Sequence, residues 1–304
     1  MFYIVLAIFC SVAIGVVFKM FDKYNIDHFQ AIVFNYLICV ITGCLALGAV
    51  PFEASMLQAD WMPIMLVLGL LFVSGFNFVS RTVQHFGIAI SSVAQRMSLG
   101  LSVPFSIWFY NDPYTSLTLL GIALALLSVL LINVPAKHKE VGVATGDVSE
   151  QNSSEALGAP IVAKKELSKW IFLYPIITFL VSVFIEIILQ YLHVVHEMQP
   201  AVESIVLFAL AGTFGVVGIV VMRQRLAWKN FLAGIALGIP NYFSIYFLLR
   251  ALESWNGSVV YSVNNITVVA ISAVLGYFFF KERLTPLNAL GIVLALIASY
   301  LLVK

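Results

Sequence analysis

Ten long apolar stretches, separated by short polar gaps, organise the chain. A helix needs about 20 predominantly apolar residues to cross the hydrocarbon core of a bilayer. The stretches that approach this length fall at approximately residues 2–20, 30–50, 62–80, 88–109, 116–134, 169–191, 201–222, 230–249, 258–280 and 287–303. The pattern therefore predicts an all-α integral membrane protein with ten transmembrane helices.

Composition supports this prediction. Hydrophobic residues make up 62% of the chain, charged residues make up 10%, and the mean hydropathy is +1.02. Soluble domains contain roughly 45–50% apolar and about 25% charged residues, so a soluble core does not account for this excess. The formal net charge of +1 offers no basic domain for a nucleic acid. Tryptophans favour the lipid headgroup level, and those of this chain lie near the ends of the stretches, at Trp61, Trp108, Trp170, Trp228 and Trp255.

Residues 136–168 interrupt the apolar pattern. They combine charged side chains such as Lys137 and Glu140 with serines and small residues. This composition is typical of a flexible linker. Because the segment follows the fifth stretch, it divides the chain into a five-helix unit at 1–135, the linker at 136–168 and a second five-helix unit at 169–304.

The two five-helix units resemble each other in sequence. Three blocks of the first unit recur in the second at a nearly constant offset, namely 68–81 with 237–250, 109–115 with 279–285, and 121–126 with 291–296. Chance similarity among apolar helices does not predict such regularity. Since each unit holds an odd number of spans, the second must enter the membrane from the opposite side. The sequence therefore predicts two inverted five-helix repeats, a plan common among secondary transporters.

Lysine and arginine are distributed unequally between the two faces of the predicted bundle. The gaps after the odd-numbered spans contain thirteen of them, whereas the opposite face contains only Arg250 and Lys304. Cytoplasmic loops are enriched in these residues. We therefore expect a multi-pass protein of the plasma (inner) membrane, with the linker in the cytoplasm and both termini outside.

Several polar residues lie inside the predicted spans, where an ionisable group costs roughly 2.5–3.5 kcal/mol. Arg96 lies beside Gln95 in the fourth span, and Glu186 lies in the sixth. Such groups face protein or water, so each is a functional candidate. We expect a substrate-binding cavity between the two units, formed by Arg96, Gln95, Asn77, Asn241, Tyr242, Asn264 and Asn265.

These residue types suggest distinct roles. Arg96 would attract an anionic group, most simply a carboxylate, and the amides would supply neutral hydrogen bonds. Glu186 is the candidate carrier of a coupling proton. The alternative is structural, with Arg96 and Glu186 forming a simple pair and the amides holding helices together. For Glu203, near the start of the seventh span, we expect a solvated position at the membrane interface.

The sequence contains no recognisable catalytic or cofactor motif. The three cysteines lack a Cys-x-x-Cys spacing, and His193 and His196 lack the spacing of a zinc-protease motif. We therefore expect no enzyme activity, no metal and no cofactor. Three glycines in the seventh span indicate close helix packing, within the chain or against a second chain, so the oligomeric state stays open; they are Gly212, Gly215 and Gly218.

A short turn before the last span suggests a family. It reads Lys281-Glu282-Arg283-Leu284-Thr285-Pro286 and is followed by Leu290-Gly291. With the two five-helix units, it makes the chain similar to the EamA-like ten-helix members of the drug/metabolite transporter superfamily. In those proteins a glutamate-containing turn precedes the final helix of each repeat. The first unit departs from this pattern, since only Asp112 and Thr115 echo the turn, and the expected orientation differs from the termini-inside arrangement usual in the family.

The resemblance implies transport of a small polar metabolite. Because the sequence shows no ATP-binding motif, a gradient must supply the energy. We expect a secondary transporter that exports a small polar metabolite such as an amino acid by alternating access, with protons as the candidate coupling ion. One alternative is a proton-coupled multidrug exporter of lipophilic cations with the same fold. Another, from a different class, is a membrane-embedded enzyme or a sensor.

Overall fold

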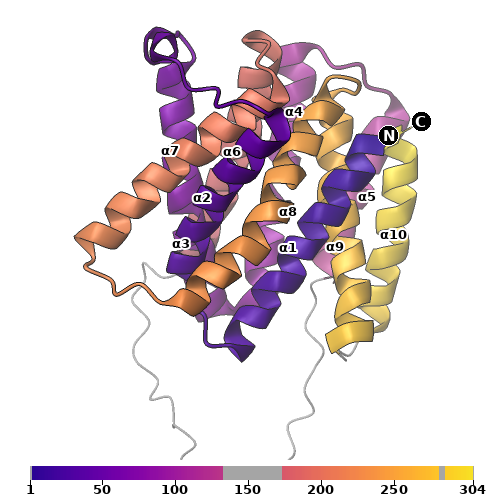
Figure 1. The fold of residues 1–304 in the computed structure, drawn as a ribbon. Helices are drawn as coiled ribbons and strands as arrows, with labels where there is room; N and C mark the ends of the chain where they lie inside the picture. The colour runs from indigo at the N-terminus through magenta and orange to yellow at the C-terminus, as the bar shows by residue number, and fades with distance from the viewer. Residues whose placement is uncertain (1, 133–172, 281–284, 304) are drawn as a thin grey trace, which may run out of the picture.

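The computed structural model describes residues 2–132, 173–280 and 285–303. Within these ranges the chain forms ten α-helices and one short 3-10 helix, η1 (Ala54–Gln58), which confirms the predicted all-α fold (Figure 1). The α-helices are α1 (Phe2–Lys23), α2 (His28–Leu47), α3 (Met62–Arg96), α4 (Leu99–Tyr110), α5 (Ser116–Ile132), α6 (Leu173–Val195), α7 (Pro200–Val221), α8 (Trp228–Leu252), α9 (Gly257–Phe280) and α10 (Pro286–Val303). The linker at 136–168 and its boundaries lie outside the described residues, so the division into units at 1–135 and 169–304 stays a prediction.

Most of these helices can cross a bilayer by length and composition. Among the described residues, six helices contain a sufficiently long apolar stretch: His28–Leu47, Met62–Val79, Leu173–Val195, Pro200–Val221, Trp228–Leu252 and Gly257–Leu275. Shorter apolar helices occupy Phe2–Phe18, Ser116–Ile132 and Pro286–Leu302. Seventeen residues rise about 25 Å, which is near the lower limit for a span. The chain is a multi-pass membrane protein.

The two ends of the helical bundle are distinguished by which helices begin and end there. We call the upper end in Figure 1, where α1 begins and α10 ends, the terminal face. We call the lower end, where α5 ends and α6 begins, the linker face. The first helix of one half, α1, therefore starts at the terminal face, and the first helix of the other half, α6, starts at the linker face. Corresponding helices run in opposite directions, as inverted repeats require.

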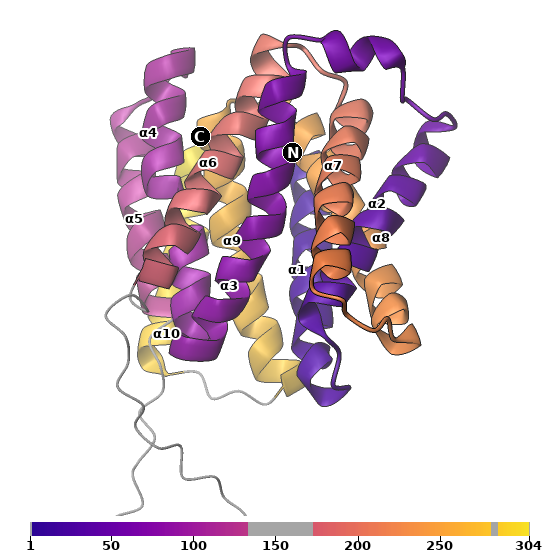
Figure 2. The same ribbon diagram turned by 90° about the vertical axis from the view of Figure 1, so that its left-hand side faces the viewer.

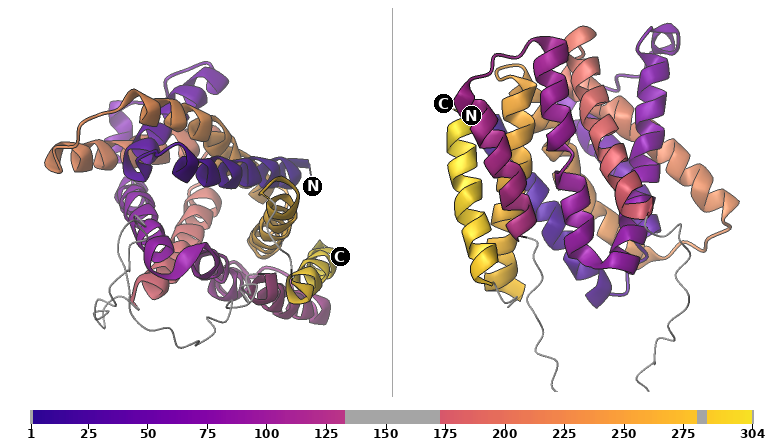
Figure 3. Two further views of the ribbon diagram at one scale, coloured as in Figure 1. Left: turned by 90° about the horizontal axis from the view of Figure 1, so that it is seen from below. Right: turned by 180° about the vertical axis from the view of Figure 1, so that it is seen from behind.

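The contacts between helices have the symmetry of the repeat, in which α1 to α5 correspond to α6 to α10 in order. α5 packs against α10 and α2 packs against α7, so in both contacts a helix meets its own counterpart. The contact of α3 with α6 corresponds to that of α1 with α8. Seen from below, α5 and α10 lie at one edge of the molecule and α7 at the opposite edge (Figure 3). A pseudo-two-fold axis therefore passes between α5 and α10 and between α2 and α7.

Glycines at the α5–α10 contact show this exchange at the level of single residues. A Cβ atom added to Gly121 would lie 2.9 Å from Leu302, and one added to Gly291 would lie 2.8 Å from Ile132. Gly291 and Leu302 are the counterparts of Gly121 and Ile132 when the last of the three matching blocks is aligned and extended along the helix. The repeat seen in the sequence therefore places equivalent residues in equivalent contacts.

The α2–α7 contact shows the same reciprocity. A Cβ atom added to Gly43 would overlap Ile205, and one added to Gly215 would lie 2.7 Å from Val33. Gly215 follows Gly43 along the chain by the same interval as Ile205 follows Val33. Close approach of the two helices at this crossing therefore depends on a glycine from each half.

One predicted boundary is wrong. The apolar pattern predicts separate spans at 62–80 and 88–109, but α3 continues from Met62 to Arg96 and curves across the linker face (Figure 2). The residues between the two stretches include Arg81, Gln84 and His85 but no proline, and polar side chains alone do not end a helix. The helix is interrupted instead at Met97–Ser98. There the Ser98 hydroxyl donates at 2.7 Å to the Gln95 carbonyl, which an uninterrupted helix would offer to a backbone N–H.

Candidate functional site

Two opposite charges are joined through an amide inside the bundle. Arg96 Nη1 donates to Asn265 Oδ1 at 2.7 Å, and Asn265 Nδ2 donates to Glu186 Oε1 at 2.8 Å. The amide suits this position because its carbonyl oxygen accepts from the guanidinium while its NH2 group donates to the carboxylate. Arg96 and Glu186 are thus coupled, but by way of Asn265. The structure brings together three of the residues that the sequence singled out.

Helices from both halves supply these groups. Arg96 ends α3, Glu186 lies within α6 and Asn265 lies within α9. Arg96 and Asn265 are 169 residues apart, which is the offset between the matching blocks 68–81 and 237–250. The pair therefore lies close to the pseudo-two-fold axis, where the two halves meet. Secondary transporters commonly bind substrate and coupling ions at such an interface, beside interrupted helices.

Ser98 connects the carboxylate to the interruption between α3 and α4. Its hydroxyl oxygen lies 3.0 Å from Glu186 Oε1 and 2.7 Å from the Gln95 carbonyl oxygen. A hydroxyl has only one proton to donate. When Glu186 is ionised, Ser98 can donate to it; when Glu186 is protonated, the carboxyl can donate to Ser98, which then donates to Gln95. The arrangement therefore accommodates both protonation states of Glu186.

The second carboxylate oxygen of Glu186 is the least satisfied atom of the network. Glu186 Oε2 is buried and has no hydrogen-bond partner among the described residues. Leaving a buried acceptor without a partner costs about 1–3 kcal/mol, and more when the group is charged. Tyr261 donates to the backbone carbonyl of Glu186 at 3.1 Å and so ties α6 to α9. Oε2 is therefore available to accept a proton or a donor group from a ligand.

A cavity of about 80 Å³ lies between α3 and α6 beside the charged network. Gln95 and Ile185, the chain neighbours of Arg96 and Glu186, are both in its wall. The wall consists of Phe72, Gly75, Phe76, Val79, Gln95, Thr178, Val181, Ser182 and Ile185. Small-molecule sites usually measure about 300–1,000 Å³. Binding of a metabolite would therefore require α3 and α6 to separate further.

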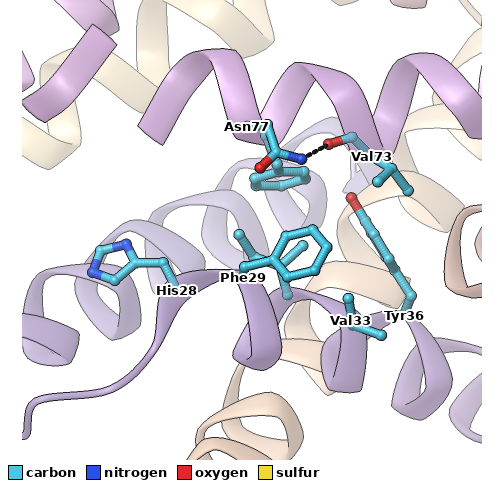
Figure 4. A pocket seen from close by; sticks show the side chains of 8 residues that line it. His28, Phe29, Val33, Tyr36, Val73 and Asn77 are labelled. Carbon is cyan, nitrogen blue, oxygen red and sulfur yellow. Dashed lines mark hydrogen bonds between the residues drawn. The ribbon is translucent and has the colours of Figure 1, made fainter. Parts of the chain in front are cut away.

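Asn77 lines a different cavity, of about 30 Å³, between α2 and α3 (Figure 4). Its amide nitrogen donates to the Val73 carbonyl at 3.1 Å, which is a bond within its own helix. Phe29 and Tyr36 contribute aromatic rings to the wall, and His28 lies at the α2 end. In this conformation Asn77 is therefore adjacent to an apolar space that is separate from the Arg96 network.

Asn241 and Tyr242 lie in the contact between α2 and α8. Asn241 Nδ2 donates at 3.1 Å to Oδ1 of Asn35, a residue with no exposed surface. Tyr242 is 1% exposed and stacks on Tyr246 with a ring separation of 5.9 Å. The Asn241–Asn35 bond joins two helices, as in the structural alternative for the amides, whereas the Tyr242–Tyr246 stack lies within α8. Asn264, beside Asn265, is buried, and its Oδ1 has no partner in the described parts of the chain.

Glu203 differs from the expectation of a solvated interface residue, because it has no exposed surface. Its Oε2 lies 3.2 Å from Nδ1 of His193, which is itself 8% exposed. The two residues flank the turn between α6 and α7, so the reversal of the chain brings them together. The available sequence signal is their separation of ten residues around Pro200.

Asp112 makes side-chain contacts that the sequence pattern does not predict. Its Oδ2 accepts from the Ser106 hydroxyl at 2.7 Å and from the backbone N–H of Ser258 at 3.0 Å. Ser258 is in the first turn of α9, where N–H groups lack helical acceptors and a negative charge is favourable. Gln190 of α6 donates to Ser106 at 2.8 Å. Asp112 therefore joins α4, α6 and α9 at the terminal face.

Known proteins resemble the chain over nearly its full length. Residues 1–134 match the EamA-like transporter family. An uncharacterized protein of Haemophilus influenzae is 30% identical over 308 residues, covering 98% of this chain and 96% of that protein. A crystal structure of another protein superposes with a TM-score of 0.73 at 12% identity, over 99% of this chain and 94% of that one, which shows a shared fold. The chain belongs to the EamA-like transporter family.

Proposed function

We propose that the protein is a secondary transporter that exports a small polar metabolite bearing a carboxylate, such as an amino acid, by alternating access. The observation that supports this most directly is the chain of contacts from Arg96 through Asn265 to Glu186. The carboxylate of the substrate would replace the side-chain oxygen of Asn265 as the acceptor for Arg96, because a charged acceptor makes the stronger hydrogen bond. No enzymatic step is part of the proposal.

Glu186 is the proposed coupling residue. Once a substrate carboxylate takes Arg96, the Asn265 amide is free to turn, and Glu186 loses a donor that favours its ionised form. Substrate binding would then change the affinity of Glu186 for a proton. By linkage, protonation of Glu186 must change substrate affinity by the same factor, which is what coupled transport requires.

The distribution of space supports an alternating-access cycle. Both cavities described above lie next to α3, and each includes a residue near the linker-face end of a second helix, His28 of α2 in one and Thr178 of α6 in the other. In the opposite half, polar side chains of α4, α6 and α9 are closely packed, and Ser106 and Ser258 have no exposed surface. We propose that this conformation is the one closed towards the terminal face. The Lys and Arg distribution favours a cytoplasmic linker face in the plasma (inner) membrane, and the closed side would then be outside.

Export of lipophilic cations is the second candidate, and Glu186 Oε2 is the observation that favours it. A buried carboxylate oxygen without a partner can hold a cation. The nearby guanidinium opposes this function, since Arg96 is coupled to the same carboxylate through one amide. An enzyme at the terminal face has less support, because His193 is already in contact with Glu203.

A transport assay in reconstituted vesicles tests the proposal. Radiolabelled amino acids and a lipophilic cation such as tetraphenylphosphonium are followed with and without a proton gradient, in wild type, Arg96→Ala and Glu186→Gln. We expect loss of amino-acid transport in both variants. Arg250→Ala and Glu253→Gln are matched controls, because these two residues form a half-exposed ion pair at the end of α8. Retention of transport by Arg96→Ala together with movement of the lipophilic cation would favour the second candidate.

A further inference from the structure

Three helices present polar side chains to one another between the charged network and the terminal face. We call this set the polar column. Each helix contributes one residue per turn, on one side of the helix. The column consists of Ser98, Ser102 and Ser106 from the start and body of α4, Glu186 and Gln190 from α6, and Asn265, Ser262 and Ser258 from α9. Such regular spacing on three neighbouring helices is not required for packing, which apolar residues achieve at lower cost.

Hydrogen bonds define the two ends of the polar column. At the inner end, Ser98 lies 3.0 Å and Asn265 lies 2.8 Å from Glu186 Oε1. At the outer end, Asp112 accepts from Ser106 at 2.7 Å, and Gln190 donates to the same serine at 2.8 Å. Both ends therefore terminate in a carboxylate, one inside the bundle and one in the turn between α4 and α5 at the terminal face.

The polar column is buried and incompletely bonded, both between its two ends and beside Asp112. Ser102 is 1% exposed, and Ser258 and Ser262 have no exposed surface. The hydroxyl groups of Ser258 and Ser262 have no partner among the described residues. Buried hydroxyls without partners are costly, so their presence calls for an explanation beyond stability. At the outer end Asp112 is 8% exposed, which brings a titratable group close to the surface.

We propose that the polar column is the route by which protons pass between the terminal face and Glu186. The inference rests on the proposed role of Glu186 as the coupling residue, and adds the side from which its proton comes. Hydroxyls one helical turn apart are about 5–6 Å from each other, a distance that one bridging water can span. The tight packing of the serines leaves no passage for a metabolite in this conformation.

The transfer conserves protons at every step. A proton from water outside binds Asp112; each serine or water then passes its own proton inward while receiving one from behind. The last proton binds the Glu186 carboxylate, and Ser98 turns its remaining proton to the Gln95 carbonyl, 2.7 Å away. The titratable or charged groups around the route are Asp112, Tyr110, Tyr261, Arg96 and the His193–Glu203 pair.

Time-resolved infrared spectroscopy tests the route with the proton itself as the probe. Full-length protein is reconstituted in one orientation in vesicles, and the pH outside one face is lowered suddenly. The carboxyl band absent from Glu186→Gln reports protonation of Glu186. We expect Ser102→Ala and Asp112→Asn to slow the appearance of this band at least about tenfold after a pH jump at the terminal face. A tenfold slower rate corresponds to an activation free energy about 1.4 kcal/mol higher. The final amplitude of the band should be unchanged.

Two further variants separate the route from folding. Ser102→Thr keeps the hydroxyl and should restore the rate. Ser128→Ala removes an equally buried hydroxyl in α5 and should change nothing, because among the described residues this hydroxyl bonds to its own helix, at the Ala125 carbonyl. Unchanged rates in Ser102→Ala and Asp112→Asn would overturn the route while leaving Glu186 as the coupling residue. If no Glu186 band appears at any pH, the coupling role and the route both fail, whereas the Arg96 transport assay remains an independent test of the proposed substrate.

Discussion

Two of the places where the halves of the protein meet at the pseudo-two-fold axis differ in chemistry. At the α2–α7 crossing, Tyr36 stacks on Phe208 with ring centroids 6.0 Å apart, so both sides offer a similar apolar surface. At the second crossing, between the end of α3 and α9, the residues facing each other are Arg96 and Asn265. Two arginines meeting at an axis would repel, whereas an amide can accept from a guanidinium. Similar residues from the two halves therefore support packing at the first crossing, whereas different residues from the two halves permit a polar site at the second.

Removal of the charge at the second crossing should have the largest effect on function. We expect Arg96→Ala to lower the rate of amino-acid transport about 100-fold or more, since loss of a buried charged hydrogen bond costs about 2–5 kcal/mol in binding. Arg96→Lys should recover only part of the rate, because an ammonium cannot make the planar two-point contact of a guanidinium. Initial rates in vesicles measure both. Normal transport by Arg96→Ala would show that the asymmetry at this crossing is structural.

Overpacking at the first crossing should instead affect stability. We expect Gly43→Val and Gly215→Val each to lower the free energy of unfolding by about 1–3 kcal/mol, because the added atoms overlap Ile205 and Val33 respectively. The two effects should be similar, since the contacts are equivalent. Thermal unfolding in detergent measures them, with Gly15→Ala as the control because a Cβ atom there meets nothing within 4 Å. Very unequal effects would argue against the pseudo-two-fold axis.

The two neighbouring asparagines of α9 sharpen the comparison. We expect Asn265→Ala to reduce transport about tenfold, because it removes the amide between Arg96 and Glu186 and leaves both less satisfied, at a cost of about 1–3 kcal/mol. Asn264→Ala should change the rate less than Asn265→Ala, since Asn264 Oδ1 has no partner to lose among the described residues. Parallel transport assays compare the pair. A larger defect in Asn264→Ala would indicate that the substrate site lies on the Asn264 side of α9 instead.

The smallest functional effect is expected for Ser98. Replacing it by alanine removes one neutral donor to Glu186, worth about 0.5–1.5 kcal/mol. That donor favours the ionised carboxylate, so its loss should shift the pH dependence of transport towards higher pH. Rates measured across a pH series test the direction. A shift towards lower pH would indicate that Ser98 mainly accepts from a protonated Glu186.

Much of the architecture could be predicted from the chain alone. The apolar runs locate most helices to within a few residues, because helix length is fixed by bilayer thickness. The break after Arg96 was not predictable from hydropathy, since it depends on a hydroxyl bonding to a nearby carbonyl. Asp112 was also missed in this role, because its acceptor function depends on Ser258, a residue 146 positions away.

Sequence by itself determined that Arg96, Glu186 and Asn265 lie in apolar spans, where uncompensated polarity is costly. It also determined the repeat, since matching blocks recur at a nearly constant offset between the two halves. Only the tertiary structure decided which of these groups meet. It joins Arg96, Asn265 and Glu186 but places Asn241 against Asn35. Hydropathy fixes the depth of a residue in the membrane, whereas the rotation and neighbours of each helix are set by side-chain packing between distant segments.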